Sequence, residues 1–207
     1  MKNWFPATIV LAVAARLMAA EEDWVSKELD AAAQQLEQRH FALAHDVYRN
    51  LALVHQVAPL NAMAIQQVHN GIAATAGRLK ADEVRTTSAG FVERAKRLSY
   101  VQVGSAWMPP QAKERLPANA AAKLGKLVQA KACPACQGQG VSSCANCQFG
   151  IVRCMACNGT GRTGGSPITS RGAPCVLCDG RGKVKCSLCR GTGFVVCPKC
   201  DGLGAVE

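Results

Sequence analysis

The sequence predicts an α-helical N-terminal part followed by a small β part that bound metal ions stabilise. Residues 24–99 carry apolar side chains at the three-and-four spacing of buried helix faces. All twelve cysteines fall instead between positions 133 and 200, where large apolar side chains are few. A segment with so few core residues needs another source of stability, and closely spaced cysteines can supply it.

The first twenty residues have the pattern of an export signal. Lys2 supplies the positive start, residues 5–15 form an apolar run, and small residues precede a run of acids. The apolar run is too short to span a bilayer. We therefore expect a signal peptide over residues 1–20, an exported (periplasmic or secreted) chain, and no stable membrane span after cleavage. Arg16, which interrupts the pattern, leaves a short membrane anchor as the alternative.

Residues 21–103 are predicted to form a helical domain of four helices. The histidines of this region, which include His45, are expected to be partly exposed helix residues and not metal ligands. The apolar positions that mark the helices are Leu29, Ala32, Ala33 and Leu36; Phe41, Ala44, Val47, Tyr48, Leu51 and Val54; Ile65, Val68, Ile72, Ala76 and Leu79; and Val84, Phe91, Ala95 and Leu98.

Part of this helical domain resembles a tetratricopeptide repeat. The resemblance rests on Leu36, Phe41, Ala44, Tyr48 and Pro59, and it covers roughly one and a half repeats. The usual Leu-Gly pair of the repeat is absent. The resemblance implies stacked helix pairs, and a plain antiparallel helical bundle is the alternative.

Residues 104–131 are predicted to be a linker that contains one short helix. Three prolines interrupt its first half, and an Ala/Lys-rich run indicates a helix from about residue 119 to residue 130. Trp107 is expected to pack against the helical domain.

The twelve cysteines form six Cys-x-x-Cys pairs within residues 132–207. Such a turn lets two thiolates point at one metal ion, and glycines after it let backbone amides approach the sulfurs. Five pairs continue as Cys-x-x-Cys-x-Gly-x-Gly, whereas Cys147 is followed by Gln148, Phe149, Gly150 and Ile151. The pairs are Cys133/Cys136, Cys144/Cys147, Cys154/Cys157, Cys175/Cys178, Cys186/Cys189 and Cys197/Cys200.

The spacing of the pairs is nearly palindromic about Ser166. The midpoint of Cys133 and Cys200 is position 166.5, and the midpoint of Cys154 and Cys178 is position 166. A hairpin folded there would nest the pairs, outer with outer and inner with inner, as three tetrahedral four-thiolate sites suited to Zn²⁺. Pairing of sequential neighbours is the alternative, and it leaves the symmetry unexplained.

These motifs resemble the cysteine-rich domain of the DnaJ (forty-kilodalton heat-shock) co-chaperones, over about a third of the chain. That family domain has four such motifs, nested on a V-shaped extended β-hairpin with two zinc ions. Six motifs therefore imply three Zn²⁺ ions here. The His-Pro-Asp motif of a J domain is absent, so stimulation of a heat-shock ATPase is not implied. The resemblance implies zinc binding and contact with non-native polypeptide or a protein partner, in a chaperone-like or scaffold role.

The net charge of +10 first suggests a nucleic-acid partner. Four thiolates on one zinc ion, however, carry a net charge of about −2, so three sites would offset the basic residues around them. Nucleic-acid binding is therefore only the second alternative function, and interleaved aromatic residues that would support it are missing. The residues expected to neutralise the thiolates are Arg153, Arg181, Lys183, Lys185, Arg190 and Lys199.

The sequence favours a non-catalytic protein. It contains no nucleophile elbow, no phosphate-binding glycine loop and no His-Glu-x-x-His motif. Four cysteines around each metal ion would leave no open position for a catalytic water. The first alternative function is a thiol–disulfide oxidoreductase or isomerase that uses one exposed Cys-x-x-Cys pair. The favoured function is an exported zinc-binding protein that binds a protein partner or non-native polypeptide.

Overall fold

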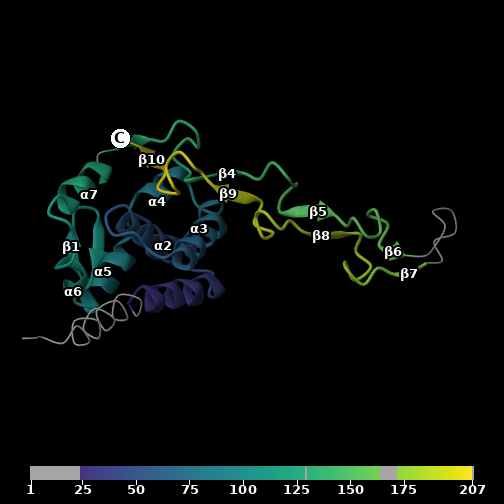
Figure 1. Cartoon of the computed structure of the whole chain (residues 1–207), viewed down its shortest axis with the longest axis horizontal. Coiled ribbons are helices and arrows are strands. Elements are labelled where there is room, and N and C mark those ends of the chain that lie inside the picture. The colour runs from purple at the N-terminus through teal and green to yellow at the C-terminus, as the bar shows by residue number, and fades with distance from the viewer. Residues whose placement is uncertain (1–23, 129, 164–171, 207) are drawn as a thin grey trace, which may run out of the picture.

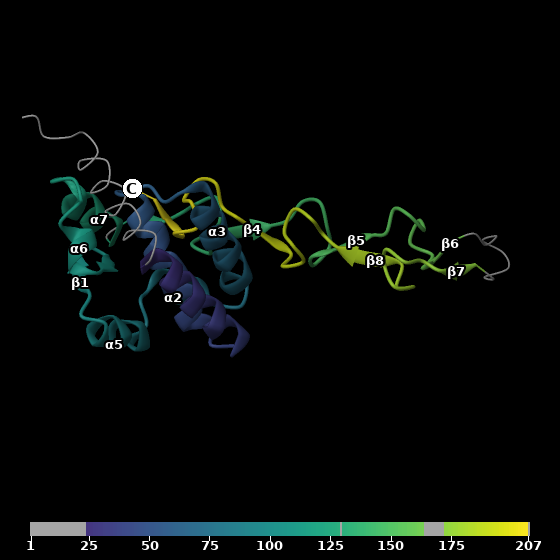
Figure 2. The same ribbon diagram turned by 60° about the horizontal axis from the view of Figure 1, so that its bottom comes forward.

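The computed structural model describes every residue except 1–23, 129, 164–171 and 207, so the predicted signal peptide lies outside the described residues. A helical body occupies one end, and a narrow arm of paired strands extends from it (Figures 1 and 2). This is the predicted combination of helices with small antiparallel hairpins. Within the described part of the chain, no helix is long and apolar enough to cross a membrane.

The helical body begins with a helix that covers residues 24–37. The region predicted as one fourth helix is in fact two, because Ser88 is extended and its Oγ accepts a hydrogen bond from the Phe91 amide, which starts a new helix. The helices that follow the first are α2 (Phe41–His55), α3 (Ala62–Ala76), α4 (Ala81–Arg85) and α5 (Ala89–Arg97).

Helix α2 lies at the centre of the body. The sequence predicts one buried face, but every residue from Ala44 to Val54 is buried. Neighbouring elements bind most of its buried polar groups: Asp46 accepts a hydrogen bond from the Ser88 amide at 3.0 Å, and Arg49 donates one to Thr87 Oγ1 at 3.3 Å, although Arg49 Nε has no partner. The prediction that the histidines are partly exposed is wrong for His45, which is fully buried with Nδ1 2.9 Å from Thr75 Oγ1 and Nε2 3.3 Å from the Val84 carbonyl oxygen. Burial lowers the pKa of His45 to about 4.

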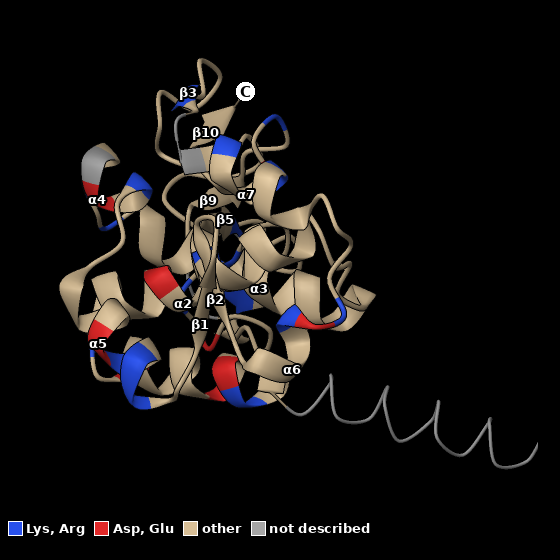
Figure 3. Ribbon diagram, turned by 90° about the vertical axis from the view of Figure 1, so that its left-hand side faces the viewer, with Lys and Arg blue, Asp and Glu red and all other residues tan. Residues whose placement is uncertain are grey.

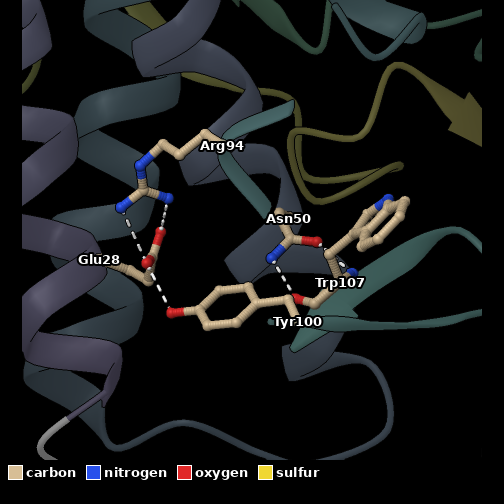
Figure 4. Close-up of polar contacts among 5 residues, drawn as sticks. All are labelled: Glu28, Asn50, Arg94, Tyr100 and Trp107. Carbon is tan, nitrogen blue, oxygen red and sulfur yellow. Dashed lines mark hydrogen bonds and ion pairs between the residues drawn. The ribbon is translucent and has the colours of Figure 1, made fainter. Parts of the chain in front are cut away.

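Two groups of polar contacts join distant segments of the helical body, one around Glu28 and one around Asn50 (Figure 4). The Glu28 carboxylate is nearly fully buried and accepts two hydrogen bonds from the Arg94 guanidinium, at 2.6 and 2.9 Å. The Tyr100 hydroxyl donates a third, at 2.7 Å. Asn50 of α2 exchanges two hydrogen bonds of 2.7 Å with the backbone of Trp107. These contacts join segments that are far apart in the sequence.

The segment predicted as a linker packs as part of the helical body instead. Met108 and Leu124 are fully buried in the same apolar cluster as the helices, and Trp107 packs against that cluster as predicted. The short helix is present, but it is preceded by a tight hairpin that was not predicted from the sequence. The elements are β1 (Val101–Val103), which pairs antiparallel with β2 (Ala106–Met108), then α6 (Pro110–Lys113) and α7 (Ala120–Val128).

The arm is one long hairpin whose strands are two or three residues each. Each strand before the tip pairs antiparallel with a strand after it, from the body outward to the tip. The pairs are β3 (Lys131–Ala132) with β10 (Ala205–Val206), β4 (Val141–Ser143) with β9 (Phe194–Val196), β5 (Ile151–Arg153) with β8 (Lys183–Lys185), and β6 (Arg162–Thr163) with β7 (Ala173–Pro174).

Candidate metal centres

The twelve cysteines gather into three clusters of four, one between each two successive strand pairs. In each cluster the four Sγ atoms lie within 4.8 Å of one another. The grouping is the nested one, because every cluster takes two cysteines from each side of the tip. The outer cluster is Cys133, Cys136, Cys197 and Cys200; the middle cluster is Cys144, Cys147, Cys186 and Cys189; the inner cluster, nearest the tip, is Cys154, Cys157, Cys175 and Cys178.

Reciprocal backbone hydrogen bonds hold the two halves of each cluster together. The amide of the first cysteine in each pair donates to a glycine carbonyl oxygen in the facing motif. In the outer cluster these bonds are Cys133 N to Gly204 O and Cys197 N to Gly140 O, both 2.9 Å. These backbone hydrogen bonds join motifs on opposite sides of the tip, so they agree with the nested grouping of the sulfur atoms.

The glycines of the motif are required by this close approach of two backbones. Gly140 and Gly161 have φ angles of +70° and +76°, which favour glycine over residues with a Cβ atom. A Cβ atom on either residue would collide with the carbonyl oxygen of the facing glycine, Gly202 or Gly180. The sequence predicts that these glycines let backbone amides approach the sulfur atoms. The structure adds a second role, which is to let the backbones of two facing motifs come into contact.

The sulfur geometry fits a tetrahedral metal ion. A zinc–sulfur distance of about 2.3 Å requires sulfur atoms about 3.8 Å apart. The facing pairs lie at 3.9 and 3.7 Å in the outer cluster, 3.9 and 3.6 Å in the middle cluster, and 3.9 and 3.7 Å in the inner cluster. All twelve cysteines are free, and a disulfide would need about 2.05 Å. Each cluster could therefore hold one metal ion.

Backbone amides favour the thiolate form that metal binding requires. Burial raises the pKa of the Cys157 thiol, but the Gly161 amide and the neighbouring thiols outweigh burial and lower that pKa to about 6. Burial likewise raises the pKa of the Cys189 thiol, but the Gly193 amide and the neighbouring thiols outweigh burial and lower that pKa to about 6. Burial and the thiols around it raise the pKa of Cys147 to about 12. In the outer cluster, backbone amides and neighbouring thiols likewise outweigh burial and lower the pKa of Cys133 to about 7, so each cluster contains one thiol with a lowered pKa.

The motif that lacks the expected glycines forms a different turn. Phe149 and Gly150 have φ angles of +52° and +85°, as in a type I′ turn, and Gln148 and Ile151 exchange backbone hydrogen bonds of 3.2 and 3.1 Å around them. The Gly150 carbonyl oxygen still accepts the Cys186 amide at 2.8 Å, which is the contact that the second glycine makes elsewhere. The motif therefore keeps its cluster contact with one residue fewer.

Basic side chains lie close to the cysteine turns. Arg153 and Lys183 face each other across β5 and β8, between the middle and inner clusters. Two like charges opposite one another destabilise a strand pair unless negative charge lies nearby, as it would in metal-bound tetrathiolate clusters. On the helical body, Lys and Arg are interspersed with Asp and Glu (Figure 3). The position of Arg153 and Lys183 between two cysteine clusters therefore agrees with a role in neutralising the thiolates.

The outer cluster is attached to the helical body. Asp201, next to the ligand Cys200, lies 2.8 Å from His69 Nε2 of α3 and accepts a hydrogen bond from Gln56 at 3.2 Å. The His69 contact is the main cause that lowers the pKa of Asp201. The Phe194 ring packs so closely on Gly77 that a side chain at Gly77 would displace it. The sequence contained no signal for this attachment, because its residues lie more than a hundred positions apart.

The middle and inner clusters carry exposed apolar side chains, and the outer cluster does not. The inner positions of the outer Cys-x-x-Cys turns hold Pro, Ala and Lys. At the other two clusters, large apolar side chains occupy such positions or follow the turn. Their exposed fractions are Phe149 95%, Met155 83%, Val176 88%, Leu177 73% and Leu188 58%.

The fold and the site together define a class: a helical body with a hairpin arm that carries three tetracysteine clusters of the kind found in zinc-finger-like domains. Comparison with protein-family models, with curated proteins and with solved structures finds no match to this chain. The functional argument therefore rests on the residues and their geometry.

Proposed function

We propose that the chain binds three zinc ions, one in each cluster, and that it is an exported, non-catalytic protein. The observation that supports zinc is the separation of 3.6 to 3.9 Å between facing sulfur atoms in all three clusters. Four cysteines close each cluster, so a bound ion would have no open position for a substrate. The bound ions would stabilise the hairpin, as they do in the DnaJ domain that its motifs resemble.

Elemental analysis of protein purified without added metal tests the zinc assignment, with a count of free thiols on the same sample. We expect close to three zinc ions per chain and no free thiol until a chelator is added. Iron in place of zinc would change the metal assignment. Twelve cysteines in disulfides with no bound metal would contradict the proposal. N-terminal sequencing of the exported chain tests removal of residues 1–20.

The partner that we propose is an apolar segment of non-native polypeptide, bound along the part of the arm that carries the middle and inner clusters. Met155, Val176, Leu177 and Leu188 are exposed on cysteine turns that backbone hydrogen bonds hold in place. Several large apolar side chains exposed in one part of a structure are typical of interaction sites, and the flexible methionine side chain adapts to varied apolar partners. The resemblance to the DnaJ cysteine-rich domain supports the same class of partner.

A binding assay with a reduced and alkylated, permanently unfolded protein tests this partner. Changing Met155, Val176, Leu177 and Leu188 to serine together should weaken binding by up to about a thousandfold, since each change removes roughly 1 kcal/mol of apolar contact and every 1.4 kcal/mol is a factor of ten. The matched control changes Met63 and Leu98 to serine, which are 74% and 46% exposed on the helical body. Equal binding by both variants, with three metal ions still bound, would show that the arm is not the binding surface.

A further inference from the structure

The middle cluster differs from the other two in three ways. Cys147 is the one cysteine of the twelve that is not buried. It belongs to the motif that is one residue short, and the tight turn there places the bulky Phe149 at a φ angle of +52°, which is costly for such a residue. The side chain of Phe149 is 95% exposed, so it does not cover the cluster.

The third difference concerns hydrogen bonds to sulfur. In four of the intact motifs, the amide four residues after the second cysteine donates to its sulfur, at 3.2 to 3.3 Å. A second amide, two residues after the cysteine, also donates to the sulfurs of Cys136, Cys157 and Cys189. After Cys147 the Ile151 amide donates to the Gln148 carbonyl oxygen at 3.1 Å, and the Gly150 amide donates to the Cys147 sulfur. A hydrogen bond to a charged group stabilises that group considerably, so the Cys147 thiolate, with the Gly150 amide as its backbone donor, has one such bond fewer than the thiolates of Cys136, Cys157 and Cys189.

We propose that the middle cluster is the reactive one, and that Cys147 is a site of oxidation by hydroperoxides that releases the metal ion of this cluster before the other two. The inference rests on the proposed function only in taking the clusters to hold metal ions. It concerns regulation of the arm, because loss of the middle ion would interrupt the arm between the body and the apolar turns at the inner cluster.

The chemistry is a two-electron oxidation of two thiolates. The Cys147 thiolate attacks one oxygen of the hydroperoxide, the O–O bond breaks, and a sulfenic acid and an alkoxide or hydroxide form. The facing Cys189 sulfur, 3.6 Å away, then attacks the sulfenic sulfur and expels hydroxide, which leaves a Cys147–Cys189 disulfide. The hydroperoxide is reduced, both sulfurs are oxidised, and two of the four metal ligands are lost.

The test exposes the full chain with three bound metal ions to dilute hydrogen peroxide, and in a parallel sample to a chelator. Free thiols are then alkylated at intervals and located by mass spectrometry. We expect the four cysteines of the middle cluster to change about tenfold faster than those of the other clusters, the factor that one hydrogen bond to a charged group supplies. The peroxide sample should contain a Cys147–Cys189 disulfide. Reaction of the inner or outer cluster first, or of all three at one rate, would overturn the proposal.

Two variants test the cause. Inserting one glycine between Gln148 and Phe149 restores the intact motif spacing and should remove most of the tenfold difference. Deleting Gly159 gives the inner cluster the spacing of the middle one, and should make the inner cluster comparably reactive. Phe149→Ala keeps the spacing and should leave the rates unchanged within about twofold.

The outcomes separate this inference from the zinc proposal. A chain that holds three metal ions but loses the middle one no faster retains the proposed function and refutes the inference. If the insertion variant cannot bind three metal ions, the proposal is still tested by the Gly159 deletion and by the order in which the three clusters of the unaltered chain react. An unchanged reaction rate of the inner cluster after that deletion would refute the role of the motif spacing.

Discussion

Removal of the metal ions should unfold the arm and leave the helical body folded. Among the described residues from 144 to 193, the buried apolar side chains are all cysteines. Ordering a backbone costs about 1–2 kcal/mol per residue, whereas a structural zinc site contributes on the order of 10–16 kcal/mol at neutral pH. Without metal, no apolar core in the arm offsets the cost of ordering it.

The helical body has its own source of stability. Leu51, Ile72 and Phe91 are almost completely buried, and each such side chain contributes about 1.5–3 kcal/mol. The end of the arm that joins the helical body should be less sensitive to metal removal than the tip, because Val141 and Leu203 are buried in the core of the body.

Two measurements on the full chain check this prediction. In a chelator, amide resonances of residues 144–193 should lose their dispersion while far-ultraviolet circular dichroism keeps its helical signal. Returning zinc should restore the dispersion, and acid should mimic the chelator because protonated thiols release metal. A dispersed spectrum without metal would refute the reasoning, and so would loss of the helical signal along with the arm.

Three further predictions follow from the same structure. Cys133→Ser and Cys200→Ser should each lower the metal content by one ion, and the double variant should lose no second ion; loss of two would indicate sequential pairing. Burial lowers the pKa of His45 to about 4, so as the pH falls the His45 side chain takes up a proton in the unfolded chain at a higher pH than in the folded chain. The stability of the metal-free body should therefore be complete above pH 6.5 and fall by about 3 kcal/mol as the pH drops to 4, and His45→Gln should flatten this slope in urea titrations. Glu28→Ala should lower the free energy of unfolding by about 3–5 kcal/mol because it leaves Arg94 unpaired, whereas Glu93→Ala, on the surface, should change it by about 0.5 kcal/mol or less.

The cysteine clusters were largely predictable from the sequence, because ligand spacing is local and its symmetry favours nested pairing over sequential pairing. The helices with regular apolar spacing were predictable for the same reason. The burial of His45, the packing of Met108 into the body and the Asp201–His69 contact were not. Each depends on tertiary contacts between segments that are distant in the sequence, and the local pattern of a single sequence does not indicate such contacts. The short turn at Phe149 was visible as a departure from the motif, but its hydrogen bonds were not.

The nested order of the clusters also affects how the arm can form during synthesis. No cluster can be completed until the chain has passed its tip, because each needs two cysteines from the second half. The missing ligands then appear in a fixed order: the inner cluster is complete at Cys178, the middle one at Cys189 and the outer one at Cys200. The inner cluster also closes the shortest loop, and loop closure costs least there. Synthesis and chain entropy therefore favour the same sequence of events, in which metal loading starts at the tip and proceeds toward a helical body that has already been made.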